Sequence, residues 1–253
     1  GIGTNMTIPI GSLSFSNGVV SNPGLVGREA AYYSIVVPTN LPSWRLELST
    51  NLGESLLILQ KDALPNVAAG GYAPTSLYGG RKMQKAGNEQ YLMMPAYNQS
   101  NIVAGTYYLA VVSEGMNPSY PYLGTNSSAY TLTSYGPLGV TNIGTVDNTG
   151  ATDIIVTNSN VAGQLSAFQF VVPPNTLSME VHLENRVGNP TMLLRTDNQL
   201  TGGSDSYGVD GGQGSMWSSP TLINIANPTV TNYTLMVQAI ASGGDASYRI
   251  RIH

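Results

Sequence analysis

Two aromatic side chains beside a glycine-rich stretch are the first candidates for chemistry in this chain. Trp217 lies in the segment Gln213-Gly-Ser-Met-Trp-Ser-Ser-Pro220, and Tyr207 is close to it in sequence. An indole ring offers a flat apolar face to the C–H face of a sugar, and its N–H can donate to a hydroxyl. Trp217 and Tyr207 are therefore candidate ligand-binding residues. The alternative is that Met216 or Trp217 is an inward residue of a strand that covers the edge of the fold.

Carboxylates gather in the same part of the chain. Asp205 and Asp210 lie within the glycine-rich segment 201–214, and Asp197 comes just before it. Calcium takes about six to eight oxygen ligands, which aspartates and loop carbonyls can supply, so these three aspartates form a candidate calcium site. Their spacing does not fit the EF-hand loop, and solvated turn carboxylates are the alternative.

The histidines offer little for catalysis. His182 stands between Glu180 and Glu184 in an alternating segment, and His253 is the other histidine. A Ser-His-Asp system needs a histidine that touches a serine and is oriented by an acid, and the sequence lacks a Gly-x-Ser-x-Gly nucleophile segment. With no cysteine and no histidine cluster, the usual zinc ligand sets are also absent. We therefore predict no catalytic residues and a protein that is not an enzyme.

Charge is scarce and unevenly distributed. Charged residues make up 9% of the chain, and the net charge is −4. Residues 1–136 carry six basic and six acidic groups, whereas residues 137–253 carry four basic and eight acidic groups. Because Arg81-Lys82 with Lys85 is the only basic cluster, we expect no nucleic-acid partner. No apolar run approaches the roughly 20 residues that cross a bilayer, so we expect no membrane span.

The elements that must position these residues occur twice. The segment Tyr33-Ser-Ile-Val-Val-Pro38 returns as Phe168-Gln-Phe-Val-Val-Pro173, 135 residues later (173 − 38). The correspondence runs without a gap to the pair Asp62 and Asp197, which favours a shared turn role for Asp197. A repeated segment of this length predicts a duplicated domain.

The repeat unit has the pattern of β-strands. Apolar and charged residues alternate in Trp44-Arg-Leu-Glu-Leu48, and Met179-Glu-Val-His-Leu183 alternates in the same register. Period two indicates strands with one packed face and one solvated face. We therefore predict an all-β fold of two tandem antiparallel β-sandwich domains, residues 1–136 and 137–253. Because Trp44 corresponds to Met179, we expect its side chain to fill the core.

The spacing of the repeat also predicts where the loops lie. The shift falls from 135 to 118 residues at the matched pair Tyr130 and Tyr248 (248 − 130), so the first copy contains extra residues. Insertions of this kind belong in surface loops, which we expect over 63–104 and 113–128. The copies meet near Tyr135-Gly-Pro-Leu-Gly139, and a linker this short predicts a fairly fixed neighbour.

The order of these segments resembles the bacterial pre-peptidase C-terminal domain family, over most of both halves. The resemblance begins with the Tyr-x-x-x-Val-Pro opening at Tyr33–Pro38, which Phe168–Pro173 resembles. It continues with a Gly turn before an apolar strand that ends in Asp, at Gly53–Asp62 and Gly188–Asp197. The last two motifs are the Gly-Thr-Tyr-Tyr-Leu-x-Val strand at Gly105–Val111 and the closing Tyr-x-Leu strand at Tyr130–Leu132. Family members often carry an aspartate soon after the Gly turn, where this chain has Glu54-Ser-Leu56 and Asn189-Pro-Thr191. The resemblance implies jelly-roll-like sandwiches.

The resemblance also implies a function. It points to a non-catalytic, extracellular accessory module of a larger secreted bacterial protein. Some relatives bind matrix proteins or glycans and some bind calcium, so the implied partners are a polysaccharide or surface protein and other domains of the same precursor. Together with Trp217 and Tyr207, this predicts carbohydrate binding at a cell surface. The alternative is a structural repeat of a cell-surface or self-assembling extracellular protein, which the tandem copies and short linker favour.

Overall fold

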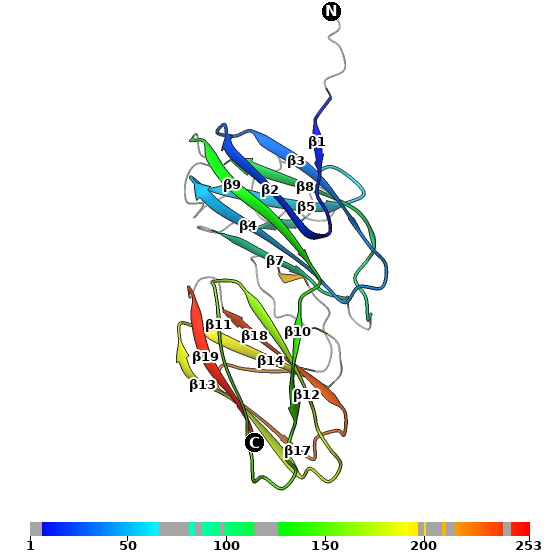
Figure 1. Ribbon diagram of the computed structural model, residues 1–253, viewed down its shortest axis with the longest axis vertical. Coiled ribbons are helices and arrows are strands. Elements are labelled where there is room, and N and C mark those ends of the chain that lie inside the picture. The colour runs from blue at the N-terminus through cyan, green and yellow to red at the C-terminus, as the bar shows by residue number, and fades with distance from the viewer. Residues whose placement is uncertain are drawn as a thin grey trace, which may run out of the picture.

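The computed structural model describes residues 7–65, 81–83, 88–96, 99–113, 126–196, 200, 209–210, 216–239 and 244–253. Every regular element in this part of the chain is a β-strand, and the strands form four sheets (Figure 1). Most neighbouring strands are antiparallel, three pairs are parallel, and the sheets pack in pairs. The predicted all-β fold with antiparallel β-sandwich packing is confirmed.

The first sandwich consists of two sheets with buried apolar side chains between them. Sheet A has the order β1 (Ile10–Ser12), β3 (Ala30–Val37), β8 (Gly105–Ser113), β5 (Ser55–Lys61) and β6 (Arg81–Met83). Sheet B has the order β15 (Val209–Asp210), β7 (Glu89–Met93), β4 (Trp44–Leu52), β9 (Ser128–Gly136) and β2 (Ser16–Leu25).

The second sandwich has the same construction, with its own buried cluster. Sheet C has the order β10 (Val140–Thr145), β12 (Leu165–Val171), β18 (Asn232–Ala239), β14 (Pro190–Arg195) and β16 (Met216–Ser219). Sheet D has the order β11 (Ile154–Asn160), β19 (Ala246–Ile252), β13 (Ser178–Val187) and β17 (Leu222–Ala226).

The two sandwiches share one strand order. Sheet A reads β1-β3-β8-β5-β6, and sheet C reads β10-β12-β18-β14-β16. Apart from the short added strand β15, sheet B reads β7-β4-β9-β2, and sheet D reads β17-β13-β19-β11. The first strand of each sandwich even pairs in parallel at the same place, since Ile10 lies opposite Tyr32 and Val140 lies opposite Ala167.

Positions matched in the repeat are buried in the two cores. Trp44 is completely buried, as expected, and so is its counterpart Met179. The Trp44 indole packs edge-on against Tyr107, with ring centroids 5.3 Å apart, and its Nε1 donates to Ser134 Oγ at 2.9 Å. In the second core, the rings of Phe170 and Tyr233 stack at 5.6 Å. A buried indole with a satisfied N–H is a packing residue.

The expected loop over 63–104 is wrong in part. Strand β7 lies inside it and pairs with β4, so that Trp44 lies opposite Met93. Strand β6 also lies inside it, next to β5. The segment was read as a loop because its residues have no sequence match in the second copy, although β17 occupies the same place in sheet D.

The two sandwiches meet along one edge of sheet B (Figure 1). A cluster of buried apolar residues, which we call the joint, connects the end of β7 to the outer face of sheet C. It consists of Leu92, Met94, Leu165, Ala167, Leu193, Leu200 and Met236, with Leu138 of the linker packed against it. The short strand β15 follows β14 in sequence but pairs in parallel with β7 of sheet B. The outer face of sheet B is therefore partly covered near β7, whereas Tyr135 on β9 and Val19 on β2 are exposed.

Candidate functional site

The aromatic and acidic residues proposed from the sequence fall mostly outside the described part of the chain. Asp197, Asp205 and Tyr207 lie outside the described residues altogether. The backbone of Trp217 is described, and it pairs with Leu194 on β14. The backbone of Asp210 pairs with Met93 on β7. The carbohydrate and calcium sites proposed at these positions remain predictions.

The residues that the structure does describe contain no group of three or more histidine, aspartate or glutamate side chains placed to hold a metal ion. Over the same residues, no helix is long and apolar enough to cross a membrane.

The outer face of sheet B brings an exposed tyrosine together with an ion pair. Tyr135, near the end of β9, is 40% exposed. The guanidinium carbon of Arg45 lies 4.3 Å from the centre of its ring, and its hydroxyl donates to Glu47 Oε2 at 3.2 Å. Arg45 Nη2 also donates to Glu47 Oε2, at 3.3 Å. This trio, which we call the tyrosine patch, presents an aromatic face, a cation and a carboxylate in one place.

The electrostatics of the tyrosine patch keep its carboxylate charged. Burial acts to raise the pKa of the Glu47 carboxyl, but the nearby Gln90 amide and the hydrogen bonds from Ser49 and Tyr135 outweigh it, so this pKa lies below its usual value. Burial raises the pKa of the Tyr135 phenol, and the neighbouring Glu47 charge raises it further. At neutral pH the patch therefore holds an ionised acceptor, a cation and a protonated phenol.

Hydroxyl and amide groups extend this face away from the tyrosine patch. Ser21 on edge strand β2 lies 3.0 Å from Thr131 on β9, hydroxyl to hydroxyl. Asn51 on β4 donates to the same threonine hydroxyl at 3.2 Å, and Ser49 donates to Glu47 at 2.9 Å. Val19 is exposed among these polar groups. The result is a sheet surface with an aromatic ring at one end and a row of hydroxyl and amide groups beside it.

The equivalent face of sheet D has different chemistry. Glu184 on β13 accepts from Arg249 Nε at 3.0 Å and from Arg251 Nε at 2.8 Å, both on β19. Arg251 also pairs with Asp153 at 3.5 Å. Hydrogen bonds from Arg251 and Arg249 hold the pKa of the Glu184 carboxyl below its usual value. These charges satisfy one another, and the position matched to Tyr135 carries the imidazole of His253 in place of a phenol.

Both histidines lie on this charged face, and each has a ring nitrogen within hydrogen-bond distance of a carboxylate oxygen. His182 Nε2 is 2.8 Å from Glu180 Oε2, and His253 Nδ1 is 2.8 Å from Asp153 Oδ1. The outward position of His182 between two glutamates is confirmed. In the described part of the chain, neither ring has a serine or threonine hydroxyl as a hydrogen-bond partner. A His–acid pair without an adjacent nucleophile lacks the group that acyl transfer needs.

The sequence carries one signal for the tyrosine patch. Thr131, Thr133 and Tyr135 alternate with the buried residues of β9, which places them on the solvated face. Tyr135 was assigned instead to the linker because Gly136 and Pro137 follow it. Its neighbours Arg45 and Glu47 come from another strand, so only strand pairing could bring the trio together.

Comparison with known proteins gives distant structural likenesses only. No family model matches the chain, and no curated protein matches it. The pre-peptidase C-terminal domain of collagenase from Bacillus anthracis is 18% identical, with 52% of this chain and 99% of that chain covered and a TM-score of 0.27. The CUB1-EGF-CUB2 domains of rat MASP-1 are 8% identical, with 97% and 100% covered and a TM-score of 0.22. An archaeal virus protein with a triple jelly roll fold is 8% identical, with 93% and 58% covered and a TM-score of 0.22.

Proposed function

We propose that the chain is a non-catalytic, extracellular binding module, built from two tandem domains of the pre-peptidase C-terminal kind at residues 1–136 and 137–253. The sequence resemblance and the shared strand order of the two sandwiches support the division. A larger secreted bacterial protein would use such a module to attach to a polysaccharide or to a surface protein. Calcium at Asp197, Asp205 and Asp210 stays part of this proposal.

The tyrosine patch is the observation that carries the binding function. Tyr135 is an exposed ring on a solvated sheet face, with one side near Arg45 and a carboxylate at its hydroxyl. A sugar ring can stack its C–H face on the phenol while Arg45 and Glu47 hydrogen-bond its hydroxyl groups. The described residues on the equivalent face of the second sandwich do not contain this combination, so a difference between the copies coincides with the proposed site.

The test compares Tyr135→Ala with the unchanged protein in a glycan-array screen, followed by calorimetric titration of the best polysaccharide. Loss of the stacking ring should weaken binding by about tenfold, since an aromatic contact contributes about 1 kcal/mol or more. Tyr108→Ala is the matched control, because Tyr108 is a half-buried tyrosine on β8 of the opposite sheet and should leave binding unchanged.

Two further outcomes separate the alternatives. If Trp217→Ala abolishes binding and Tyr135→Ala does not, the ligand is held by the region of Trp217 and Tyr207. If no polysaccharide on the array binds the unchanged protein, the glycan function fails.

A structural role is the second candidate, and the joint favours it. Two sandwiches with an apolar contact between them can act as a stiff spacer in a surface protein. Light scattering over a range of protein concentrations separates the structural role from the binding role. The molar mass of a self-assembling segment should increase with concentration, whereas the molar mass of a binding module should stay constant.

A further inference from the structure

We infer that the joint fixes the two sandwiches in a single relative orientation, so that the tyrosine patch and the second sandwich move as one body. The partner of the outer face of sheet C is thus the β7 end of the first sandwich. Neighbouring domains in one chain move relative to each other by default, unless their interface is large and apolar. Four features of this interface argue against such motion.

The first feature is that sheet C buries apolar side chains on its outer face as well as in its core. Along β14, Met192 and Leu194 point into the second core, whereas Leu193 between them belongs to the joint. Along β18, Met236 belongs to the joint. Leu193 is 4% exposed and Met236 is fully buried, although both face away from their own core. A sheet face with this composition is covered in the folded protein.

The second feature is that the linker is pinned to both sandwiches. The backbone N–H of Leu138 donates to Ser43 Oγ at 2.8 Å, and Ser43 is completely buried in the first sandwich. The Leu138 side chain packs against the joint, and two residues later Val140 begins β10 of sheet C. Few backbone torsions are then left to act as a hinge.

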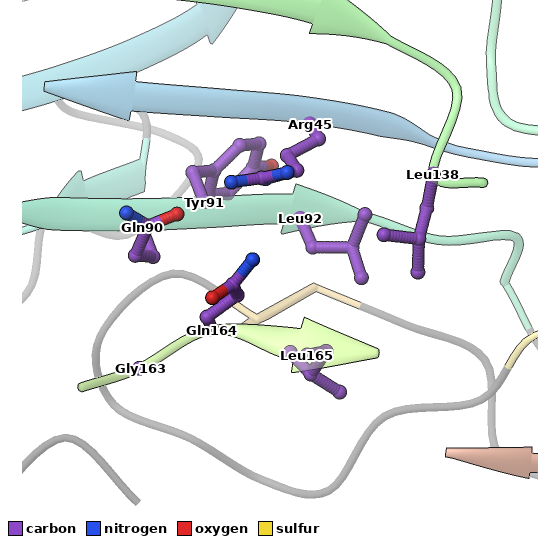
Figure 2. A pocket seen from close by; sticks show the side chains of 8 residues that line it. All are labelled: Arg45, Gln90, Tyr91, Leu92, Leu138, Gly163, Gln164 and Leu165. Atoms are coloured by element: carbon purple, nitrogen blue, oxygen red, sulfur yellow. The ribbon is translucent and has the colours of Figure 1, made fainter. Parts of the chain in front are cut away.

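The third feature is close packing. Figure 2 shows Leu92 on β7, Leu138 on the linker and Leu165 at the start of β12 around one small space at the joint. The part of this space that the centre of a water-sized sphere can reach is about 10 Å³, close to the minimum that one water molecule needs. Arg45 also lines this space, so a residue of the tyrosine patch touches the joint directly.

The fourth feature is a strand that crosses from one sandwich to the other. β15 belongs in sequence to the second sandwich, yet its backbone pairs with β7 of sheet B, with Val209 opposite Leu92. Backbone hydrogen bonds therefore connect the sandwiches in addition to the apolar contact.

The two apolar residues that the end of β7 contributes to the joint have no buried counterparts at the matched positions of the second sandwich. Leu92 lies opposite Arg45 on β4, and the matched position in the second sandwich, opposite Glu180 on β13, is Asn224. Met94 corresponds in the same register to Ala226, and both Asn224 and Ala226 are exposed. At these two positions the second sandwich therefore has an exposed amide and an exposed methyl group in place of the two buried apolar side chains of the joint.

The test measures the distance between spin labels on the two sandwiches. The chain contains no cysteine, so Leu52→Cys and Val187→Cys give two unique labels at exposed, matched turn positions. The unchanged joint should give one narrow distance distribution. In a Leu92→Asn/Met94→Asp background the narrow peak should be lost in favour of a broad distribution, because the apolar contact is replaced by hydrated groups.

A control and a milder variant keep the test decisive. Val36→Asp places the same kind of charge at an exposed position on β3 outside the joint and should leave the narrow peak intact. Leu92→Asn/Met94→Ala carries the residues that the second sandwich has at these positions, and circular dichroism checks that it remains folded. A broad distribution in the protein with its joint unchanged overturns the inference, as does a narrow peak in a folded joint variant.

Discussion

Two glycines matched in the repeat have the same structural task. Gly53 has φ +63° and Gly188 has φ +74°, in the left-handed region that side chains with a Cβ rarely adopt. A Cβ at Gly53 would lie 2.6 Å from Ser127 O, and one at Gly188 would lie 2.3 Å from Asp245 O. The close approach of two backbone segments therefore requires glycine at both turns.

Gly188→Ala should lower the free energy of unfolding by at least about 1–3 kcal/mol, because it combines backbone strain with a clash against a carbonyl. Urea denaturation measures this loss. The matched control is Gly24→Ala on β2, where a Cβ would meet no atom within 4 Å. The control should change the free energy of unfolding by less than about 1 kcal/mol. Equal effects of the two substitutions would contradict the argument.

Asp147 shows how an exposed turn can hold a carboxylate. Its two carboxylate oxygens accept from the hydroxyls of Thr149 (2.6 Å) and Thr152 (2.8 Å) and from both backbone N–H groups. These bonds, led by the Thr149 hydroxyl, lower the pKa of Asp147 to about 2. Because the carboxylate form is favoured only in the folded chain, its contribution to stability is present above the unfolded pKa of about 4.

We therefore expect the stability contributed by Asp147 to be lost as the pH falls from about 4 through about 2. A carboxyl titration followed by NMR should show the Asp147 midpoint near the lower value. Thr149→Val removes the leading hydroxyl donor and should move this midpoint upward, whereas Thr157→Val on exposed strand β11 should not. An unchanged midpoint in Thr149→Val would show that the turn does not hold the carboxylate in solution.

At the scale of elements, the edge strands β2 and β11 correspond although the sequence comparison missed them. Asn22 lies opposite Tyr130, and Asn158 lies opposite Tyr248. Burial raises the pKa of both tyrosines. Asn158 Nδ2 donates to the Tyr248 hydroxyl at 3.0 Å. The correspondence between β2 and β11 is only a few residues long. It shows in which residues lie opposite each strand, and a comparison of the two sequences alone does not contain that information.

Asn160 connects β11 to the opposite sheet of the second sandwich. Its Nδ2 donates to Val237 O at 2.8 Å, and its Oδ1 accepts from Ser166 Oγ at 2.6 Å. Asn160→Ala should lower the free energy of unfolding by about 1–3 kcal/mol, because buried partners lose their hydrogen bonds. Chemical denaturation measures this loss of stability. The control is Thr157→Ala on the same strand, which should change the free energy of unfolding by less than about 0.5 kcal/mol. A cost no larger than that of the control would mean that Asn160 does not tie the sheets together.

At the scale of the whole molecule, the sequence predicted the elements better than their assembly. The alternation of apolar and polar residues in Trp44–Leu48 and Met179–Leu183 was sufficient to predict both strands, because a strand with one buried face shows this pattern in its sequence. The joint was harder to find. Met192-Leu-Leu194 reads as an ordinary apolar run, and only the fold shows that Leu193 points away from the core.

The candidate site was predicted less well than the fold, for a physical reason. Trp217 and Tyr207 were chosen as aromatic residues near glycines, a local feature of the sequence. The tyrosine patch joins Tyr135 on β9 to Arg45 and Glu47 on β4, across a pairing that closes a loop of many residues. Sites built across strands carry no local spacing signal, so sequence reasoning finds them only when the register is already known.

The pinned linker has a mechanical consequence. If tension pulls the two sandwiches apart, the load reaches Gly136–Val140, where the Leu138 N–H is already held by Ser43. The apolar contacts of the joint and the strand pairing between β15 and β7 then resist in parallel with this short segment. In a protein tethered through both ends, these contacts would therefore have to break before the two sandwiches could separate.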